Sequence, residues 1–163
     1  MRHTGLMLAA AAATAVTLSA CNKPASSPPS GPSATPAPAM SEEDAKKAQA
    51  ALPAPYNTAD LANGESKFAL CQTCHTVVEG GPNMTGPNLF GVFGRKAASK
   101  AGFKYSDALK ATGWTWDAAR VDTWITDPKV ALPGTKMTFV GLKDPKDRTD
   151  VIAYLMVMSG YKP

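Results

Sequence analysis

The sequence predicts a small all-α domain in its C-terminal part. Apolar residues recur at the i, i+3, i+4 and i+7 spacing of one helix face at Val151, Tyr154, Leu155 and Met158. Aspartate, serine or threonine residues stand at the expected N-caps of several other segments. No segment is convincing as a strand, and no internal repeat is visible. These observations favour short helices joined by loops.

The first 21 residues are predicted to be a secretory signal. Arg2-His3 is a basic start, and the apolar run 6–18 is shorter than the roughly 18 residues of a membrane span. The run ends in Leu18-Ser19-Ala20-Cys21, which resembles the lipobox of bacterial lipoproteins. That resemblance implies cleavage before Cys21, lipidation of its thiol and a lipid-anchored location on the periplasmic side of the bacterial cell envelope. An ordinary signal and an uncleaved anchor are the alternatives.

Residues 22–56 are predicted to be a tether. Asn22–Met40 is nearly all Pro, Ala, Ser, Thr and Gly, which offers little apolar surface to bury. In Ser41–Ala51, a serine cap and Glu/Lys pairs at i, i+4 favour a helix. Because an isolated helix this short is marginal in water, we expect it to form only transiently. A flexible chain of about 35 residues has an end-to-end distance of roughly 30–35 Å.

Residues 57–163 form the predicted domain. The first helix is expected over 58–70, capped by Thr58 or Asp60, and the last begins at Asp144 with Pro145 in its first turn. The last helix is expected to reach Met158 and to stop at Gly160. Between them, short helices are expected over 106–112 and 117–126, and loops over 77–94 and 129–143.

The first predicted helix leads directly into Cys71-Gln72-Thr73-Cys74-His75. Two cysteines with two residues between them, followed at once by histidine, are typical of covalent c-type haem attachment. Each thiol adds to one vinyl group of the porphyrin, and the short spacing lets both sulfurs reach one edge of it. The imidazole that follows can then bind the iron as the proximal ligand.

Other uses of these residues fit less well. After the leader the chain has only these cysteines and the single histidine His75, too few for a zinc site or a blue-copper site. A thioredoxin-like dithiol would lie near a strand–helix–strand pattern, which is not visible here. Two buried cysteines beside a chance histidine remain an alternative that leaves the surrounding sequence unexplained.

A second axial ligand is expected on the haem face opposite His75. No other imidazole is available after the leader, so a thioether is the best candidate. Met137 is favoured because it lies in a loop far downstream, just after a Pro133-Gly134 turn. The remaining candidates lie in the tether, close to His75, or on the last helix, where methionine usually fills the core: Met40, Met84, Met156 and Met158.

The net charge of +4 is modest and scattered along the chain. Nucleic-acid binders usually concentrate basic residues on one stripe, so we expect no nucleic-acid partner. A mildly basic carrier with acidic partners fits better.

Several stretches together resemble the class I cytochromes c, closest to the mitochondrial and photosynthetic bacterial branch. The resemblance covers about residues 59–160, and it implies an all-α fold in which the N- and C-terminal helices cross beside a covalently bound haem. The stretches that carry it are 71–76, Thr85-Gly86-Pro87-Asn88-Leu89, Gly91-Val92-Phe93-Gly94-Arg95-Lys96, Gly102-Phe103-Lys104-Tyr105-Ser106-Asp107, Trp116, residues 133–141 and the last helix.

The resemblance also implies individual roles. Cys71 and Cys74 would hold the haem, His75 and Met137 would bind the iron, and the Pro87 carbonyl would accept a hydrogen bond from His75. The residues implied near the haem propionates are Arg95, Tyr105, Trp116 and Thr135. Two positions depart from the animal members. Trp124 replaces a tyrosine beside the methionine sulfur, which leaves that hydrogen bond in doubt, and Phe90 replaces a histidine.

The function implied is one-electron transport by iron that alternates between Fe(II) and Fe(III), without enzymatic activity. The implied partners are a quinol-oxidising cytochrome complex and a terminal oxidase or photosynthetic reaction centre. Two alternatives stay open: an electron-entry module of one membrane dehydrogenase, and a haem peroxidase or ligand sensor with a weakly held sixth site. Partner docking is expected at Lys96, Lys129, Lys136 and Lys143.

The predicted anchor is open to a direct test. Replacing Cys21 by serine should release the protein from the membrane into the soluble periplasmic fraction, because the serine cannot carry the diacylglyceryl thioether. Intact-mass analysis of the membrane-bound wild type should show that modification on Cys21. A serine variant that stays in the membrane with its leader uncut would instead indicate a plain signal anchor.

Overall fold

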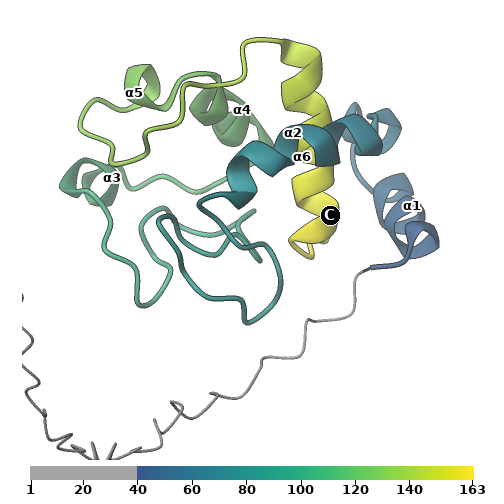
Figure 1. The fold of residues 1–163 in the computed structure, drawn as a ribbon, viewed down its shortest axis with the longest axis horizontal. Helices are drawn as coiled ribbons and strands as arrows, with labels where there is room; N and C mark the ends of the chain where they lie inside the picture. The colour runs from purple at the N-terminus through teal and green to yellow at the C-terminus, as the bar shows by residue number, and fades with distance from the viewer. Residues whose placement is uncertain (1–39) are drawn as a thin grey trace, which may run out of the picture. The chain divides into compact units, whose positions relative to one another are not determined.

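The computed structural model describes residues 40–163 and arranges them as helices joined by long loops (Figure 1). No strand is formed within this part of the chain; its one extended pairing is an isolated bridge between Lys96 and Thr115. Across the same residues, none of the helices has the length and apolarity required to cross a membrane. The elements are α1 (Glu42–Ala50), a 3-10 turn η1 (Tyr56–Thr58), α2 (Leu61–Gln72), α3 (Asp107–Ala111), α4 (Ala118–Thr126), α5 (Pro128–Ala131) and α6 (Pro145–Met158).

Helix α2 begins at a residue whose side chain accepts a hydrogen bond from a backbone amide in the first turn. The Asp60 carboxylate accepts a hydrogen bond from the Asn63 amide at 3.0 Å, so Asp60 is the N-cap and Thr58 lies in the preceding 3-10 turn. The helix continues past the predicted end at Leu70 to Gln72. Cys71 therefore lies in its last turn, as part of a rigid element.

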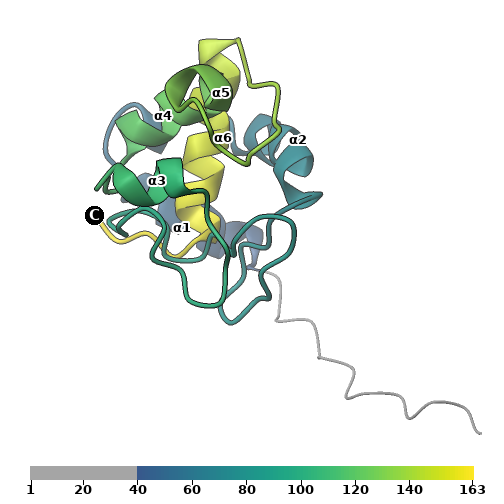
Figure 2. The same ribbon diagram turned by 90° about the vertical axis from the view of Figure 1, so that its left-hand side faces the viewer.

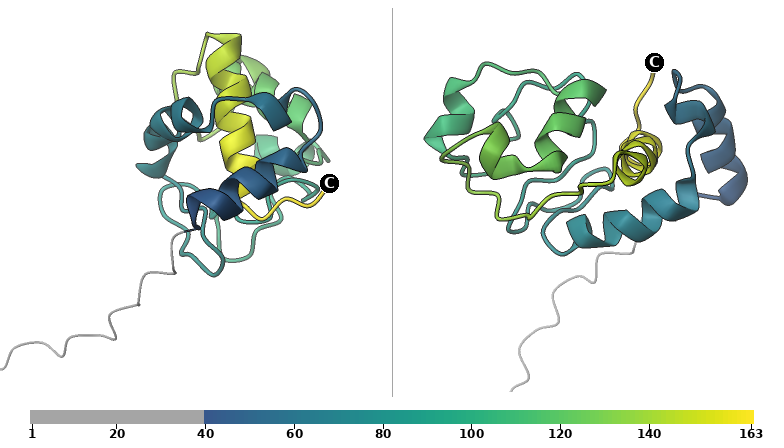
Figure 3. Two further views of the ribbon diagram at one scale, coloured as in Figure 1. Left: turned by 90° about the vertical axis from the view of Figure 1, so that its right-hand side faces the viewer. Right: turned by 90° about the horizontal axis from the view of Figure 1, so that it is seen from above.

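Helix α6 confirms the predicted start and end. The Asp144 carboxylate caps it by accepting from the Lys146 amide at 2.8 Å, and Pro145 occupies the first turn. Its burial is wider than the single apolar stripe expected, since every residue of 150–157 is buried. The reason is that α6 is central: α2, α4 and α1 all contact it (Figures 2 and 3).

Helices α2 and α6 cross closely, as the sequence resemblance implied (Figure 3). Gly64 of α2 lies directly against the backbone carbonyl of Asp150, where a Cβ atom would have no room. One turn further along α2, the rings of Phe68 and Tyr154 pack with centroids 5.3 Å apart. Glycine at the crossing thus lets the two backbones approach, and the aromatic pair fills the space beside it.

A buried carboxylate ties the same crossing together. Asp150 is only 2% exposed. Its oxygens accept hydrogen bonds from the Asp60 amide at 3.0 Å, the Asn63 side chain at 2.7 Å and the Lys146 ammonium at 2.6 Å. Burial alone would raise the pKa of Asp150, but these donors outweigh it and hold the pKa below its ordinary value.

The segment before α2 differs from the transient helix that we expected. Helix α1 is capped by Ser41 and contacts α6, with Ala45 and Ala48 packed against the core. The Gln49 side chain donates to the carbonyls of Tyr56 and Ala59, at 3.2 and 2.6 Å. Tertiary contacts therefore supply the stability that this helix would lack in isolation, and packed chain begins before Asn57.

The middle of the chain matches the prediction with one correction. Helices α3 and α4 form as expected, capped by Ser106 and Asp117. The segment after α4 is not entirely a loop, because Pro128 begins the short helix α5 instead of only ending α4. Proline is well tolerated in a first turn, and the Asp127 carboxylate caps this helix by accepting from the Val130 amide at 3.2 Å.

We predict that replacing Asp150 by asparagine lowers the free energy of unfolding at pH 7 by about 1–3 kcal/mol, because the amide cannot accept all three hydrogen bonds. Since the pKa of Asp150 is lowered in the folded state, its contribution is present above about pH 4 and is lost as the pH falls through that lowered pKa. Urea titrations of both proteins from pH 7 to pH 2 should therefore converge in acid.

The matched control is Asp147→Asn, on the same helix but with a side chain that is 20% exposed and paired with Lys67. Its loss of stability should be smaller than that of Asp150→Asn. Equal losses for the two variants would contradict a special role for the buried carboxylate.

Candidate functional site

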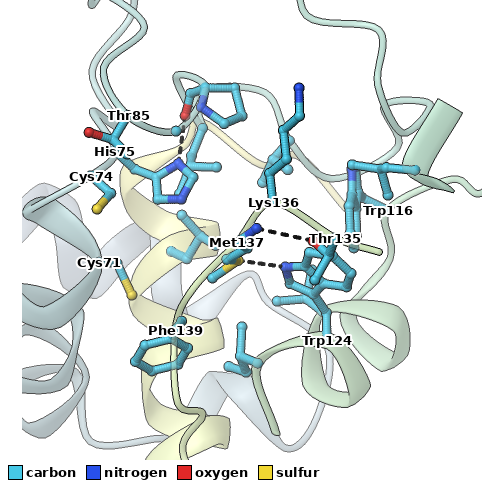
Figure 4. Close-up of a pocket in the computed structure, with 18 of the residues that line it drawn as sticks. Cys71, Cys74, His75, Thr85, Trp116, Trp124, Thr135, Lys136, Met137 and Phe139 are labelled. Carbon is cyan, nitrogen blue, oxygen red and sulfur yellow. Dashed lines mark hydrogen bonds between the residues drawn. The ribbon is translucent and has the colours of Figure 1, made fainter. Parts of the chain in front are cut away.

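A cavity of about 320 Å³ opens between α2, α3, α4 and α6 and the loops that join them. Its walls are mostly apolar, with Leu89, Leu109, Val121, Val151 and Leu155 among them. Among the residues predicted to bind haem, the cavity collects Cys71, Cys74, His75, Pro87, Arg95, Tyr105, Trp116, Thr135 and Met137 (Figure 4).

The attachment residues lie on one continuous turn of chain. The amides of Cys74 and His75 both donate to the Cys71 carbonyl, at 3.0 and 2.9 Å, so the helical path of α2 continues through the motif. Residues three and four apart on such a path share a face. Both thiols and the imidazole therefore line the cavity together.

His75 is held in one orientation. Its Nδ1 lies 2.7 Å from the Pro87 carbonyl and donates to it, which leaves Nε2 with a free lone pair (Figure 4). The backbone of Gly86 lies against the ring, at a distance where a Cβ atom would collide with it. Burial lowers the pKa of His75, and the bond to Pro87 opposes that shift, so the ring is neutral at pH 7 and suited to a metal.

The Cys71 thiol sits in an environment that favours its protonated form. Burial raises the pKa of Cys71 to about 11, with a smaller contribution from Cys74 beside it. The structure contains both as free cysteines. The Cys71 thiol is thus protonated at pH 7, and the sulfurs of Cys71 and Cys74 both line the apolar cavity.

Met137 reaches the cavity from the loop between α5 and α6. Its amide donates to the Thr135 hydroxyl at 3.2 Å, and its sulfur accepts a hydrogen bond from the Trp124 indole at 3.1 Å (Figure 4). The sequence left the second bond in doubt because tryptophan replaces tyrosine there; the indole N–H makes it. Met84 is 48% exposed and does not line the cavity, so the geometry favours Met137 as the sixth ligand.

Trp124 belongs to a cluster of three mutually packed tryptophans. Its ring centroid lies 5.5 Å from that of Trp116 and 6.2 Å from that of Trp114, all edge to face. The Arg120 guanidinium covers Trp114 at 4.5 Å from the ring centroid. Trp114 therefore packs against the core, and the cluster fixes the indole that donates to Met137.

Polar groups gather at one part of the cavity wall. Arg95 donates to the carbonyls of Phe90 and Asn88, at 2.9 and 3.2 Å, and lines the cavity beside Tyr105 and Trp116. Burial lowers the pKa of Arg95 and raises that of Tyr105, while each opposes the shift of the other. A half-buried guanidinium beside a phenol hydroxyl is an environment that stabilises a carboxylate.

The predicted docking lysines are placed differently from one another. Lys136 lines the cavity and donates to the carbonyls of Lys104 and Tyr105, at 3.4 and 3.3 Å. Lys143 forms an ion pair with Asp127 at 3.0 Å. Lys129, on α5, and Lys96 are exposed, and neither lines the cavity. The predicted lipidation site Cys21 lies outside the described residues.

Sequence reasoning did not assign site roles to several lining residues. The sequence showed Trp124 only as a replacement for a tyrosine of the family. Its distance from Met137 along the chain does not predict the hydrogen bond between them. Leu109 and Phe139 are further members of the wall, from α3 and the Met137 loop. Their apolar character is the only signal that the sequence contains, and it fits core and cavity equally well.

The residues present fit a covalently attached haem. Two thiols, a neutral imidazole with a fixed tautomer and a thioether supply the attachment and ligand set of a c-type haem, and the apolar walls suit its macrocycle. Arg95 and Tyr105 suit its carboxylates. His75 and Met137 come from separate loops that border the same cavity, as two axial ligands must (Figure 4).

Comparisons with known proteins agree with this chemistry. Residues 61–159 match the family model described as Cytochrome c. The chain is 48% identical over 105 residues to cytochrome c2 of Rhodomicrobium vannielii, an alignment that covers 64% of this chain and 84% of that protein. It is 42% identical over 106 residues to cytochrome c of Kluyveromyces lactis, covering 64% and 96%.

A solved structure is also similar. Cytochrome cH from Methylobacterium extorquens is 49% identical and superposes with a TM-score of 0.55. The match covers 59% of this chain and 96% of that one. Helix α1 lies outside the residues that match the family model.

We predict that Met137→Ala removes the weak near-infrared band of a ferric iron–methionine bond, lowers the reduction potential and lets cyanide bind the iron. The reason is that Met137 is the thioether that lines the cavity and is held by Thr135 and Trp124. Absorption spectra and cyanide titration measure these effects. The matched control is Met84→Ala, which should leave the band intact; the opposite pair of results would show that Met84 is the ligand.

Proposed function

The chain belongs to the cytochrome c family, and on that premise we propose that it carries single electrons between membrane-bound redox complexes while a lipid on Cys21 holds it at the membrane. Membership means that it contains covalently bound c-type haem and is an electron carrier rather than an enzyme. The proposed partners are a quinol-oxidising cytochrome complex on one side and a terminal oxidase or photosynthetic reaction centre on the other. The proposed location is the periplasmic side of the bacterial cell envelope.

One observation supports the carrier function above all others. Both expected iron ligands are fixed by hydrogen bonds before any partner arrives: His75 to the Pro87 carbonyl at 2.7 Å, and Met137 from Trp124 at 3.1 Å. A carrier needs a site that changes little between oxidation states, whereas a peroxidase or ligand sensor needs an open sixth position. The fixed thioether therefore favours electron transfer.

The haem supplies the iron that accepts and releases one electron. The chain supplies the surroundings: Cys71 and Cys74 would hold the group covalently, and Leu89, Leu109 and Leu155 would exclude water from the cavity. The Arg95 guanidinium and the Tyr105 hydroxyl would stabilise the negative charge of the haem carboxylates inside the fold. Because Cys71 and Leu155 lie on α2 and α6, and Arg95 is held by hydrogen bonds to the Phe90 and Asn88 carbonyls, little reorganisation would accompany the change of charge.

The tether has a clear purpose in this proposal. Because helix α1 packs on α6, the linker of this proposal shortens to Asn22–Met40, and a flexible chain of about 19 residues has a typical end-to-end distance of roughly 22–26 Å. The local concentration of the carrier beside membrane complexes then exceeds what free diffusion would provide. The charge on the domain would orient each encounter with an acidic partner surface.

We predict that reversing two charges, Lys129→Glu with Lys136→Glu, slows electron transfer to a cytochrome c-oxidising terminal oxidase severalfold at low salt. These lysines flank the Met137 loop, and encounter rates depend on steering by exposed charge. Stopped-flow oxidation of the detergent-solubilised holoprotein measures the rate. Added salt should slow the wild type and narrow the difference, since charges are screened beyond about 8–10 Å.

The matched control makes the same charge change on α1, at Lys46 and Lys47, which are exposed and do not line the cavity. It should change the rate much less, because net charge changes equally while the charge near the cavity does not. Equal slowing by both double variants would show that only net charge matters. If the wild-type rate did not change with salt concentration, Lys129 and Lys136 would contribute only to solubility.

A further inference from the structure

The loop that carries Met137 joins α5 to α6, and its two halves are supported unequally (Figure 1). In the half before the methionine, the Thr135 amide donates to the Leu132 carbonyl at 3.1 Å. In the half after it, no backbone-to-backbone hydrogen bond of the described chain involves residues 138–141. The position of this second half therefore depends on the groups that hold its last residues.

The closing end of the loop is held by Arg148, which lies on α6. Its Nη1 donates to the carbonyls of Leu142 and Lys143, at 3.2 and 2.9 Å, and its Nε donates to the Asp122 carboxylate of α4 at 2.8 Å. The Arg148 side chain is only 13% exposed. One planar guanidinium thus joins α4, α6 and two consecutive carbonyls of the loop, which the single ammonium group of a lysine could not do.

The same end of the loop is also packed closely against α4. The Leu142 amide donates to the Ile125 carbonyl at 2.8 Å, and the Leu142 side chain is buried. Gly141, at φ +93°, passes so near the Thr126 carbonyl that a Cβ atom would have no room. Arg148 connects this contact to α6, because it binds the two carbonyls that follow the glycine.

We infer that Arg148 is a positioning residue for the sixth iron ligand, because it holds the end of the Met137 loop closed. This inference rests on the proposed function and adds a residue that governs the same site. Since residues 138–141 have no backbone bonds of their own, a displacement at Leu142 passes on to Met137. The thioether then leaves the iron, and the sixth position opens. Arg148 does not line the cavity, so it acts through the loop.

A second cation at the end of the loop provides a comparison. The Lys143 ammonium donates to the Thr126 carbonyl at 2.8 Å and pairs with Asp127 at 3.0 Å. Its side chain is 63% exposed, far more than that of Arg148. Exposed ion pairs contribute little to stability, so Arg148 should hold the loop more strongly than Lys143 does. The two cations thus separate the effect of a buried fork from that of charge.

The test replaces Arg148 by glutamine in the ferric full-length holoprotein, purified in detergent. Imidazole can bind the iron only after the thioether has left, so its binding rate at saturating concentration reports how fast the loop opens. Arg148→Gln should raise this rate about tenfold or more, because bonds from a charged donor to two carbonyls are lost. Arg148→Lys should resemble it, since the charge is kept but the fork is not. The matched control Lys143→Gln should raise the rate less than about threefold.

A second control separates loop opening from a general loss of stability. Asp150→Asn acts at the crossing of α2 and α6, away from the Met137 loop, and should leave the imidazole rate within about twofold of the wild type. Hydrogen exchange of the Leu142 amide, which is bonded to Ile125, should quicken in Arg148→Gln because the loop end opens more often.

Three results would overturn the inference. The first is an imidazole rate for Arg148→Gln that stays at the wild-type value, which together with a lowered free energy of unfolding would make Arg148 purely structural. The second is an equal increase for Arg148→Gln and Lys143→Gln, since charge alone would explain it. Should Arg148→Gln fail to fold, the third is an unchanged rate for Asp122→Asn, which weakens the acceptor that orients the guanidinium.

The proposed function is tested separately. None of these measurements uses a redox partner. A wild type that does not deliver electrons to a terminal oxidase would count against the proposed function and leave the imidazole rates, and the role of Arg148 that they support, as they are.

Discussion

The close crossing of α2 and α6 is the constraint on which the rest of the structure depends. Gly64 lets the two backbones meet, and Asp150 fixes the meeting point by accepting hydrogen bonds from Asp60 and Asn63 at the start of α2. Helix α2 then has only one direction in which to continue, and its last turn delivers Cys71 to the cavity. The neighbouring side of α6 supplies Val151 and Leu155 to the cavity wall. A contact remote from the iron ligands thus decides where the attachment residues stand.

The loops that carry the ligands are ordered by side chains and not by regular secondary structure. Asn88 is fully buried and donates to the Thr76 hydroxyl at 2.7 Å and to the Val78 carbonyl at 2.9 Å. Its own carbonyl accepts from Arg95 at 3.2 Å. These bonds join both ends of the segment that contains Pro87, so the acceptor for His75 is held from two directions. A loop pinned in this way can present a backbone carbonyl as accurately as a helix would.

Sequence alone predicted the helices whose signals are local. Asp60, Asp117 and Asp144 cap helices where the sequence placed caps, because a capping side chain acts on amides only two or three residues away. The attachment motif was equally local, since its five residues are consecutive. The other predicted residues of the cavity wall came from the resemblance to the cytochrome c family, to which the chain belongs.

What the sequence did not predict depends on long-range contacts. Helix α1 has the composition of a marginal helix, and its packing on α6 cannot be inferred from nine residues of its own. The wide burial of α6 likewise reflects neighbours and not the period of its apolar residues. The hydrogen bond between Trp124 and the Met137 sulfur forms only when two separate segments meet in three dimensions. The replacement of tyrosine by tryptophan in the sequence therefore did not show whether this bond is made.

That indole has a consequence for how electrons and protons are related in this protein. A tyrosine in its place could lose its proton in alkali and could also accept a hydrogen bond, so it would connect the sulfur to the acid–base state of the solvent. Trp124 only donates, through an N–H that does not ionise in the physiological range. The hydrogen bond to Met137 therefore stays the same in acid and in alkali. Trp124 therefore adds no pH dependence to the reduction potential, and no proton needs to accompany the electron at this side of the site.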